Sequence, residues 1–228
     1  MFVKKFLKAL LRWIPSSHIL MFHHVTAQPK TRKSGCLLEL EAFQTMVSCL
    51  EHRVSSLEEV MNKRRGNVAL TFDDGLEDIY TIAYPFLTKR KLPFAVFIVT
   101  DFLDTPGYIS TSQLIEMSEN PLVTIGSHGT SHKVLPSLSL EEKKNELVQS
   151  RRILEDITGR KIEFFAYSHG QFDAETLALV KENYKLAFSV RALPLNFITY
   201  NKQLVPRVNV ETFNYNEVLA RLKKKGNY

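Results

Sequence analysis

The chain has 228 residues, of which 44% are hydrophobic and 24% are charged, which is enough for one sizeable core and too little for two large domains. Its formal net charge is +6, concentrated near the two ends, and it lacks the interleaved aromatic residues or motif of a nucleic-acid-binding protein. Its two cysteines, Cys36 and Cys49, imply no disulfide framework and favour a reduced compartment.

Residues 1–14 are predicted to form a basic amphipathic helix, with apolar side chains on one face and basic side chains on the other. The apolar residues are Phe2, Val3, Phe6, Leu7, Leu10, Leu11, Trp13 and Ile14, and the basic ones are Lys4, Lys5, Lys8 and Arg12. Lys8 and Arg12 interrupt any secretory-signal core, and the stretch is too short and too charged to span a bilayer. We expect residues 2–14 to contact the inner face of a membrane, peripherally, in a cytoplasmic protein. The alternative is a helix packed against the rest of the domain.

Short apolar runs alternate with segments of helical periodicity along residues 15–228, which we expect to form one domain. The predicted strands are His18–His23, Asn67–Phe72, Phe94–Val99, Leu122–Ser127, Ile162–Tyr167, Lys185–Val190 and Leu204–Val210. The predicted helices are Glu39–Leu50, Leu76–Lys91, Ser110–Glu119, Leu140–Thr158, Ala174–Asn183 and Tyr215–Lys224. Ser139 with Glu142 forms a capping box at the start of one helix, and Gly159 is placed to end it. This α/β alternation favours a parallel sheet, either curled into a barrel or open and doubly wound.

Two adjacent carboxylates, Asp73 and Asp74, follow the predicted strand that ends at Phe72, and Gly75 closes the turn after them. Neighbouring strand residues point to opposite sides, but at the end of a strand the second residue can turn into the loop. One carboxylate can therefore bind a metal ion while the other stays free as a base. Taken alone, an Asp-Asp-Gly run is more often just a turn.

Two histidines, His128 and His132, follow another predicted strand and lie four residues apart, so that a helical or tightly turned stretch brings them together. Such a pair is often only a surface or capping feature. Because functional side chains gather where parallel strands end, the acidic pair and the histidine pair are expected at one mouth. Two histidines and one carboxylate suit Zn²⁺ or another first-row divalent ion, namely Co²⁺, Ni²⁺ or Fe²⁺.

The sequences Thr71–Gly75 (TFDDG) and Ser127–His132 (SHGTSH) resemble the first two motifs of the polysaccharide deacetylases, the NodB-homology enzymes of carbohydrate esterase family 4. The resemblance extends from about Ile19 to Val210. It implies a metal-dependent N-deacetylase acting on N-acetylated sugars, built on a distorted (β/α)7 barrel, and it decides between the two sheet types. By the same resemblance Asp73 is the general base, and the metal ligands are Asp74, His128 and His132.

The third motif departs from the family pattern Arg-x-Pro-Phe/Tyr-Gly. The corresponding stretch is Phe165–Gly170 (FAYSHG), in which the arginine and the proline are missing. Ser168 and His169 take the places of the proline and the aromatic residue, and Gly170 is kept. In the family, a backbone N–H near this turn contacts the oxyanion, so Tyr167, Ser168, His169 and Gly170 are the expected substrate and oxyanion residues. The usual late Leu-x-His of the general acid is also absent.

In the altered third motif and the absent Leu-x-His, the chain resembles a permuted branch of the family, the poly-N-acetylglucosamine deacetylases of biofilm exopolysaccharide. Ile19–Val25 (ILMFHHV) is similar to its Tyr-His-x-Val strand, which makes His23 the expected general acid, with Phe22 replacing the tyrosine. His24 and His169 are alternatives for the acid. Val205–Val210 (VPRVNV) resembles the late Pro-Arg strand of that branch, so Arg207 is expected to supply the missing guanidinium beside the base.

The expected activity is therefore the metal-dependent removal of N-acetyl groups from a bacterial-type polysaccharide or glycolipid glycan. One alternative is a different C–N or O-acetyl ester hydrolase on the same barrel. Another is a catalytically inactive glycan-binding protein, against which the intact acidic and histidine pairs argue. The sugar, the linkage and the chain length are set by loops, and the motifs do not specify them.

Overall fold

The computed structural model describes residues 17–27, 36–62, 66–190 and 201–211. The predicted helices at residues 1–14 and 215–224 lie outside these ranges. Within them, no helix is long and apolar enough to cross a membrane. Membrane contact through residues 2–14 stays a prediction, which co-sedimentation with anionic vesicles checks by comparing the full chain with a form lacking these residues. Equal binding of the two forms would contradict it.

The centre of the molecule is a seven-stranded sheet in which every pair of neighbouring strands is parallel. Its order is β8-β7-β6-β5-β4-β1-β9. The strands are β1 (His18–Phe22), β4 (Val68–Phe72), β5 (Phe94–Ile98), β6 (Val123–Ser127), β7 (Phe164–Ala166), β8 (Leu186–Phe188) and β9 (Val208–Asn209). The strands β1, β4 and β5 are buried along their whole length, as expected for a parallel sheet covered on both faces.

The sheet curls until its two edges are joined by one segment of chain. Val205 forms a parallel bridge with Phe188 of β8, whereas Val208 and Asn209 just after it pair with β1 at the other edge. The Val205 N–H donates to the Ala187 carbonyl at 2.8 Å, and the Ser189 N–H donates to the Val205 carbonyl at 2.8 Å. The predicted distorted barrel is therefore confirmed, and the open doubly wound sheet is excluded.

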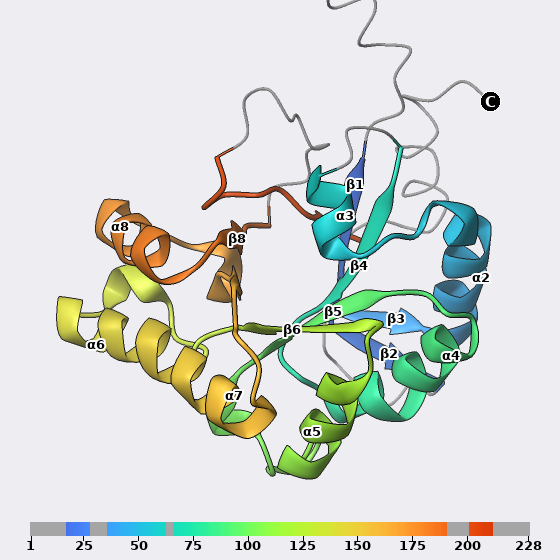
Figure 1. Ribbon diagram of the computed structural model, residues 1–228, viewed down its shortest axis with the longest axis horizontal. Coiled ribbons are helices and arrows are strands. Elements are labelled where there is room, and N and C mark those ends of the chain that lie inside the picture. Colours follow the sequence, from blue (N-terminus) through green and yellow to red (C-terminus); the bar gives the residue numbers. More distant parts are fainter. Residues whose placement is uncertain (1–16, 28–35, 63–65, 191–200, 212–228) are drawn as a thin grey trace, which may run out of the picture.

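Helices surround this curled sheet (Figure 1). They are α2 (Leu40–Leu50), α3 (Leu57–Asn62), α4 (Tyr84–Lys89), α5 (Thr111–Glu119), α6 (Leu140–Lys144), α7 (Ser150–Thr158) and α8 (Ala174–Asn183). One π-helical turn, Ile79–Ala83, precedes α4, and another, Asn145–Gln149, joins α6 to α7. Short 3₁₀ turns occur at Glu51–Arg53, Thr100–Phe102, Leu135–Ser137 and Ser168–Gly170.

Most predicted elements are present, and the differences have local causes. The predicted capping box is formed, with the Ser139 N–H donating to Glu142 at 2.8 Å, and Gly159 ends α7 at a φ of 64°. The helix predicted from Leu76 starts later, because Leu76 forms a bridge with Tyr108. The last predicted strand shrinks to β9, since Pro206 has no N–H to offer a sheet. Helix α3 and the small parallel pair β2 (His24–Thr26) and β3 (Leu37–Glu39) were not predicted.

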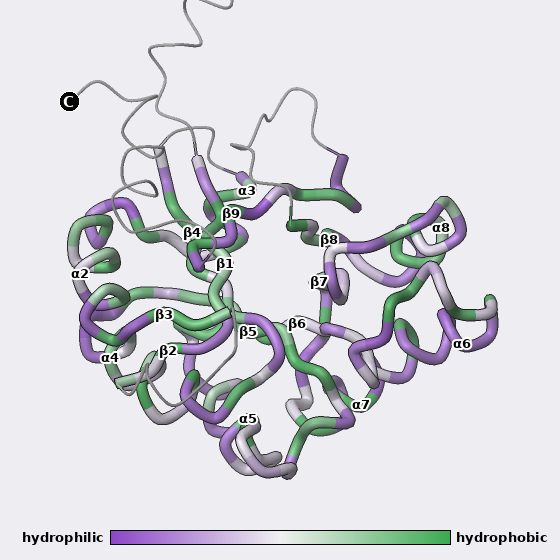
Figure 2. Tube along the Cα trace, turned by 180° about the vertical axis from the view of Figure 1, so that it is seen from behind, coloured by the Kyte–Doolittle hydropathy of each residue, from purple (hydrophilic) through white to green (hydrophobic). Residues whose placement is uncertain are grey.

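The two faces of the sheet bury different sets of residues. Alternate residues of β1, β4 and β5, among them Leu20, Phe22 and Phe72, pack outward under the helices. The intervening residues, among them Ile19 and Phe97, form a second cluster that α3 joins with Leu57, Val60 and Met61. In Figure 2 hydrophilic residues gather on outlying helices such as α6. Because the alternation continues past β4, Thr71 and Asp73 point toward the interior cluster, where Arg207 is also buried.

Candidate functional site

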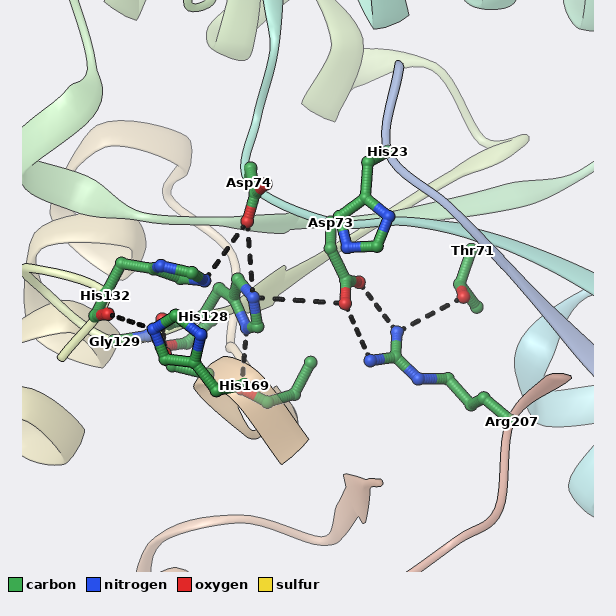
Figure 3. Close-up of polar contacts among 12 residues, drawn as sticks. His23, Thr71, Asp73, Asp74, His128, Gly129, His132, His169 and Arg207 are labelled. Atoms are coloured by element: carbon green, nitrogen blue, oxygen red, sulfur yellow. Dashed lines mark hydrogen bonds and ion pairs between the residues drawn. The ribbon is translucent and has the colours of Figure 1, made fainter. Parts of the chain in front are cut away.

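Residues that follow the carboxyl ends of the strands meet at one end of the barrel (Figure 3). Asp73 and Asp74 follow β4, and His128 follows β6. His23 follows β1, and the turn Tyr167–Gly170 follows β7. Ligand sites of parallel α/β sheets lie at this end, because each strand delivers its next residue to the same edge.

Asp73 and Arg207 form a buried, two-pronged ion pair. The Arg207 Nη1 and Nη2 atoms lie 2.7 Å from Asp73 Oδ1 and Oδ2, respectively. The Arg207 side chain is 0% exposed and also donates to Thr71 Oγ1 at 3.3 Å. Burial disfavours the ionised form of Asp73, but the Arg207 guanidinium outweighs this effect and holds the pKa of Asp73 below its usual range. Asp73 is therefore a carboxylate with a fixed orientation.

Asp74 turns away from Asp73 toward the two histidines. Its φ of 72° lies in the left-handed region, which swings its side chain out of the strand direction. Asp74 Oδ1 lies 3.4 Å from His128 Nε2 and 3.4 Å from His132 Nε2. Among the described residues it has no hydrogen-bond partner, although it is buried. Two ligand atoms of a tetrahedral zinc ion stand roughly 3.3–3.4 Å apart, so this spacing fits a shared divalent ion.

The two histidines point Nε2 at Asp74 but differ in pKa: burial lowers that of His128, yet the charges of Asp73 and Asp74 outweigh it and raise this pKa, whereas the pKa of His132 is lowered. His128 Nδ1 lies 2.7 Å from the Ala166 carbonyl, which can only accept, so Nδ1 carries the proton and Nε2 faces Asp74. Burial, reinforced by the positive potential of His128, lowers the pKa of His132 to about 4. His132 is therefore neutral near pH 7. The triad Asp74, His128 and His132 places its ligand atoms within 4.8 Å of one another.

The loop that carries both histidines is held by Glu146, which lies in the π-helical turn between α6 and α7. Glu146 Oε2 accepts from the backbone N–H groups of Thr130 at 2.8 Å and Ser131 at 3.0 Å, and its other oxygen binds the Ser131 hydroxyl. A Cβ at Gly129, whose φ is 86°, would stand 2.8 Å from Glu146 Oε2. π-Helical turns often mark functional positions, and here the turn aims a carboxylate at the ligand loop.

Glu146→Ala is therefore expected to weaken divalent-ion binding by roughly 10–100-fold, the effect typical of residues that orient ligands. The reason is that the N–H groups of Thr130 and Ser131 would lose their acceptor, and the loop that carries His128 and His132 would then lose its geometry. Isothermal titration with Zn²⁺ measures this loss. Glu155→Ala, which removes a carboxylate of α7 bonded to the Ile162 N–H instead, is the matched control. Equal affinities for the Glu146 and Glu155 variants would contradict the prediction.

His23 carries a carboxylate partner that the sequence motifs do not indicate. Glu211 Oε2 lies 2.6 Å from His23 Nδ1, and Glu211 Oε1 accepts from the His23 backbone N–H at 2.6 Å. Burial of the imidazole favours its neutral form, but the hydrogen bond and charge of Glu211, helped by Asp73 and Asp74, raise the pKa of His23 to about 9. His23 is thus positively charged at neutral pH and faces the carboxylates (Figure 3).

The two other candidates for the acid have other partners. His24 Nδ1 lies 2.7 Å from Asp78 Oδ2, at the start of the π-helical turn before α4. His169 is exposed, and its Nε2–H donates to the His132 carbonyl at 3.2 Å, so it supports the ligand loop. His23 lies beside Asp73 (Figure 3), and its assignment as the acid stays a prediction.

Within the predicted oxyanion turn, only part of the backbone can face a substrate. The Tyr167 N–H donates to the Phe188 carbonyl, and the Gly170 N–H donates to the Tyr167 carbonyl. The remaining candidate donors of this turn are the N–H groups of Ser168 and His169. The Tyr167 side chain packs in the core against Phe165, which removes it from substrate contact.

Sequence reasoning missed Glu146 and Glu211. Glu146 lies in a helical segment that contains several acidic and basic residues, most of them exposed, and its position in the helical repeat does not distinguish it from those residues. Glu211 follows the predicted strand by one residue, so only its position after a strand end could have drawn attention to it.

Comparison with known proteins shows which family model and which relatives this chain matches. The family model "Polysaccharide deacetylase" matches residues 61–186. YxkH of Bacillus subtilis is 26% identical over 176 residues, which cover 74% of this chain and 62% of YxkH. The peptidoglycan-N-acetylglucosamine deacetylase PgdA of Listeria monocytogenes is 27% identical over 161 residues, covering 67% of this chain and 33% of PgdA. The chain thus spans less than two thirds of the length of these relatives.

The fold also matches a solved structure of similar size. IcaB from Ammonifex degensii superposes with a TM-score of 0.79 over 92% of this chain and 98% of IcaB, at 21% sequence identity. This likeness confirms the barrel of the described chain.

Proposed function

Because the chain belongs to the polysaccharide deacetylase family, whose members are hydrolases that act on N-acetyl groups, we propose that it deacetylates amino sugars of a bacterial-type polysaccharide or glycolipid glycan with one divalent metal ion. Zn²⁺ is the proposed ion, and Co²⁺, Ni²⁺ and Fe²⁺ suit the same ligands. One observation carries the proposal. The carboxylate of Asp73, oriented by Arg207, lies beside a separate triad of possible metal ligands, Asp74, His128 and His132.

The metal would be held by Asp74, His128 and His132, whose spacing and orphaned Asp74 oxygen fit it. When bound there, a divalent ion polarises a carbonyl and makes water more acidic. Asp73 lies next to this triad, with its Oδ2 3.9 Å from His128 Nε2. Asp73 is the proposed base that takes the proton of an attacking water, a role supported by its pairing with Arg207, which keeps the carboxylate ionised and oriented.

The other residues of the mouth act on the intermediate and the leaving group. Attack of water on the acetamide carbon makes the carbonyl oxygen negative, and the Ser168 or His169 N–H is the proposed donor to it. Collapse of the intermediate breaks the C–N bond, and the His23 imidazolium gives its proton to the leaving amine. Since Nδ1 of His23 faces Glu211, Nε2 is the atom that donates. The products are acetate and a free amino sugar.

The acid role of His23 predicts a basic limb in the pH profile. With the pKa of His23 at about 9, kcat/KM should fall as pH rises through that value. In Glu211→Gln the burial of the ring remains while its main stabilising charge is lost, so the limb should move to lower pH. The ion pair of His23 with Glu211 also stabilises the folded protein. Because the pKa of His23 is higher in the folded than in the unfolded protein, this stabilisation is complete below about pH 6.5 and is lost as the pH rises through about 9.

Asp78→Asn provides the matched control for this prediction, because it alters the carboxylate partner of the neighbouring His24. In Asp78→Asn, kcat/KM should fall at the same basic pH as in the unmodified protein. The pH dependence of kcat/KM for the three forms measures both effects. An unmoved limb in Glu211→Gln would contradict the role of His23.

The activity is tested by acetate release from N-acetylglucosamine oligomers with β-1,4 and β-1,6 linkages, using protein stripped of metal and resupplied with Zn²⁺, Co²⁺ or Ni²⁺. Release restored by metal is the expected result, and the preferred linkage begins to define the glycan. Release from O-acetylated xylan alone would favour the ester hydrolase instead. Absence of metal binding would favour an inactive glycan-binding protein.

A further inference from the structure

A second group of potential metal ligands lies beside the site, built from three segments that are far apart in sequence. It consists of His23 after β1, Cys36 before β3 and Glu211 after β9. Their ligand atoms all lie within 4.8 Å of one another, with the His23 side chain 15% exposed and the Glu211 carboxylate buried behind it. In the described part of the chain, this is one of two such groups, and it shares no residue with the first.

The positions of these three side chains are set by the fold. The Cys36 carbonyl accepts from the His24 N–H at 3.4 Å, where β2 and β3 begin to pair, so the thiol is tied next to His23. Glu211 is held on the other side through its two bonds to His23, both 2.6 Å long. The cysteine therefore belongs to a built cluster of three donors rather than standing alone.

The donor set selects a particular class of ion. Thiolate sulfur, imidazole nitrogen and carboxylate oxygen together are ligands of Zn²⁺ and of its spectroscopic substitute Co²⁺, whereas Mg²⁺ and Ca²⁺ prefer oxygen alone. The charges of Asp73 and Asp74 act on both His23 and Cys36, so the region attracts cations.

We propose that His23, Cys36 and Glu211 form a second, inhibitory site for a thiophilic divalent cation such as Zn²⁺. Binding displaces the thiol proton and the proton shared by His23 and Glu211, and both pass to the solvent. With the ion on Nδ1, His23 is a neutral imidazole whose Nε2–H is a much weaker acid than that of the imidazolium, so protonation of the leaving amine is suppressed. The inhibitory effect rests on the proposed deacetylase function, whereas the binding site does not.

Binding is tested without activity by titrating the metal-free full chain with Co²⁺ and recording the near-ultraviolet band of cobalt–thiolate charge transfer. The unmodified chain should bind two ions, with the band developing as the second site fills. Cys36→Ser should lose the band and one ion. Cys49→Ser is the matched control, because Cys49 is exposed on α2 and outside both groups, and it should keep the band.

A variant of the first site separates the two sites and does not depend on the folding of Cys36→Ser. His132→Ala should keep the thiolate band although it lacks a ligand of the first site. Absence of the band in the unmodified chain, its persistence in Cys36→Ser or its loss in His132→Ala would each overturn the second site.

The inhibitory effect is tested by acetate release during a titration with Zn²⁺. In the unmodified chain, activity should rise with the first equivalent and then fall by at least about tenfold as the second site fills, because the imidazolium that acts as general acid is lost. Cys36→Ser should reach the same activity and keep it under excess Zn²⁺. Equal inhibition of both would overturn the inhibitory role. A thiolate band without acetate release at any Zn²⁺ level would leave the binding site standing and refute the proposed deacetylase function.

Discussion

Asp73→Asn should abolish acetate release while the metal ion remains bound. The asparagine amide cannot accept a proton from water near neutral pH, so the general base is lost, a contribution of typically 10²–10⁴-fold in rate. The ion should stay because its proposed ligands are Asp74, His128 and His132, whose ligand atoms converge without Asp73. Acetate release and metal content of the same sample measure the two halves of this prediction.

A change of stability accompanies this substitution and has to be measured with it. Asparagine offers Arg207 one acceptor oxygen in place of the two that Asp73 supplies at 2.7 Å, and it leaves the buried guanidinium without its counter-charge. Removing one partner of a buried ion pair typically destabilises a protein by about 3–5 kcal/mol. Chemical denaturation shows whether enough folded protein remains at the assay temperature. Turnover within about tenfold of the unmodified protein would contradict Asp73 as the base.

The barrel could be predicted well because its strands are nearly continuous apolar runs. Val68–Phe72 and Phe94–Ile98 are buried on both faces, so their hydrophobicity shows directly in the sequence. The missed elements are short and weakly patterned. Helix α3 has six residues, and β2 and β3 have three each, so they are formed by tertiary contacts more than by local preference.

In the candidate site, too, residues that are neighbours in the sequence could be predicted, whereas those brought together only by folding could not. Asp73 and Asp74 are neighbours in one motif, and the structure gives them different surroundings through the left-handed backbone of Asp74. Arg207 could be suggested only through a resemblance, because 134 residues separate it from Asp73. Glu211 and Glu146 could not be predicted, since a carboxylate that orients a histidine or a loop looks like any surface acid until the chain is folded.

Arg207→Ala should reduce activity far more than metal affinity. Arg207 contacts Asp73, Thr71 and Ser189, whereas the metal triad is formed by other residues. Without the guanidinium, burial raises the pKa of the Asp73 carboxyl and only the charges of His128 and His23 still oppose it, so this pKa should be higher than in the unmodified protein. The base then becomes protonated at higher pH than in the unmodified protein, so the acid limb of kcat/KM should shift upward. Equal losses of activity and of metal affinity would count against this role.

The same substitution should weaken the pH-dependent contribution of Asp73 to the stability of the fold. In the unmodified protein the pKa of Asp73 is lowered, so its pairing stabilises the fold above the unfolded value of about 3.9 and this contribution is lost as pH falls through the folded-state value. In Arg207→Ala the pKa of Asp73 is higher than in the unmodified protein, so this contribution shrinks, and the stability difference between the two proteins should become smaller as pH falls. Urea denaturation at neutral and mildly acidic pH measures this change.

Two further variants distinguish the geometry of Arg207 from its charge and from general effects of removing an arginine. Arg207→Lys keeps the positive charge but replaces the two-pronged fork by a single ammonium, so it should restore much of the stability and less of the rate. Arg90→Ala removes an arginine that stacks over Phe86 at 3.9 Å, away from the mouth, and should leave kcat/KM unchanged. Full recovery of the rate by lysine would show that charge alone orients Asp73. Because the planar guanidinium binds both oxygens of Asp73 at once, we expect lysine to fall short.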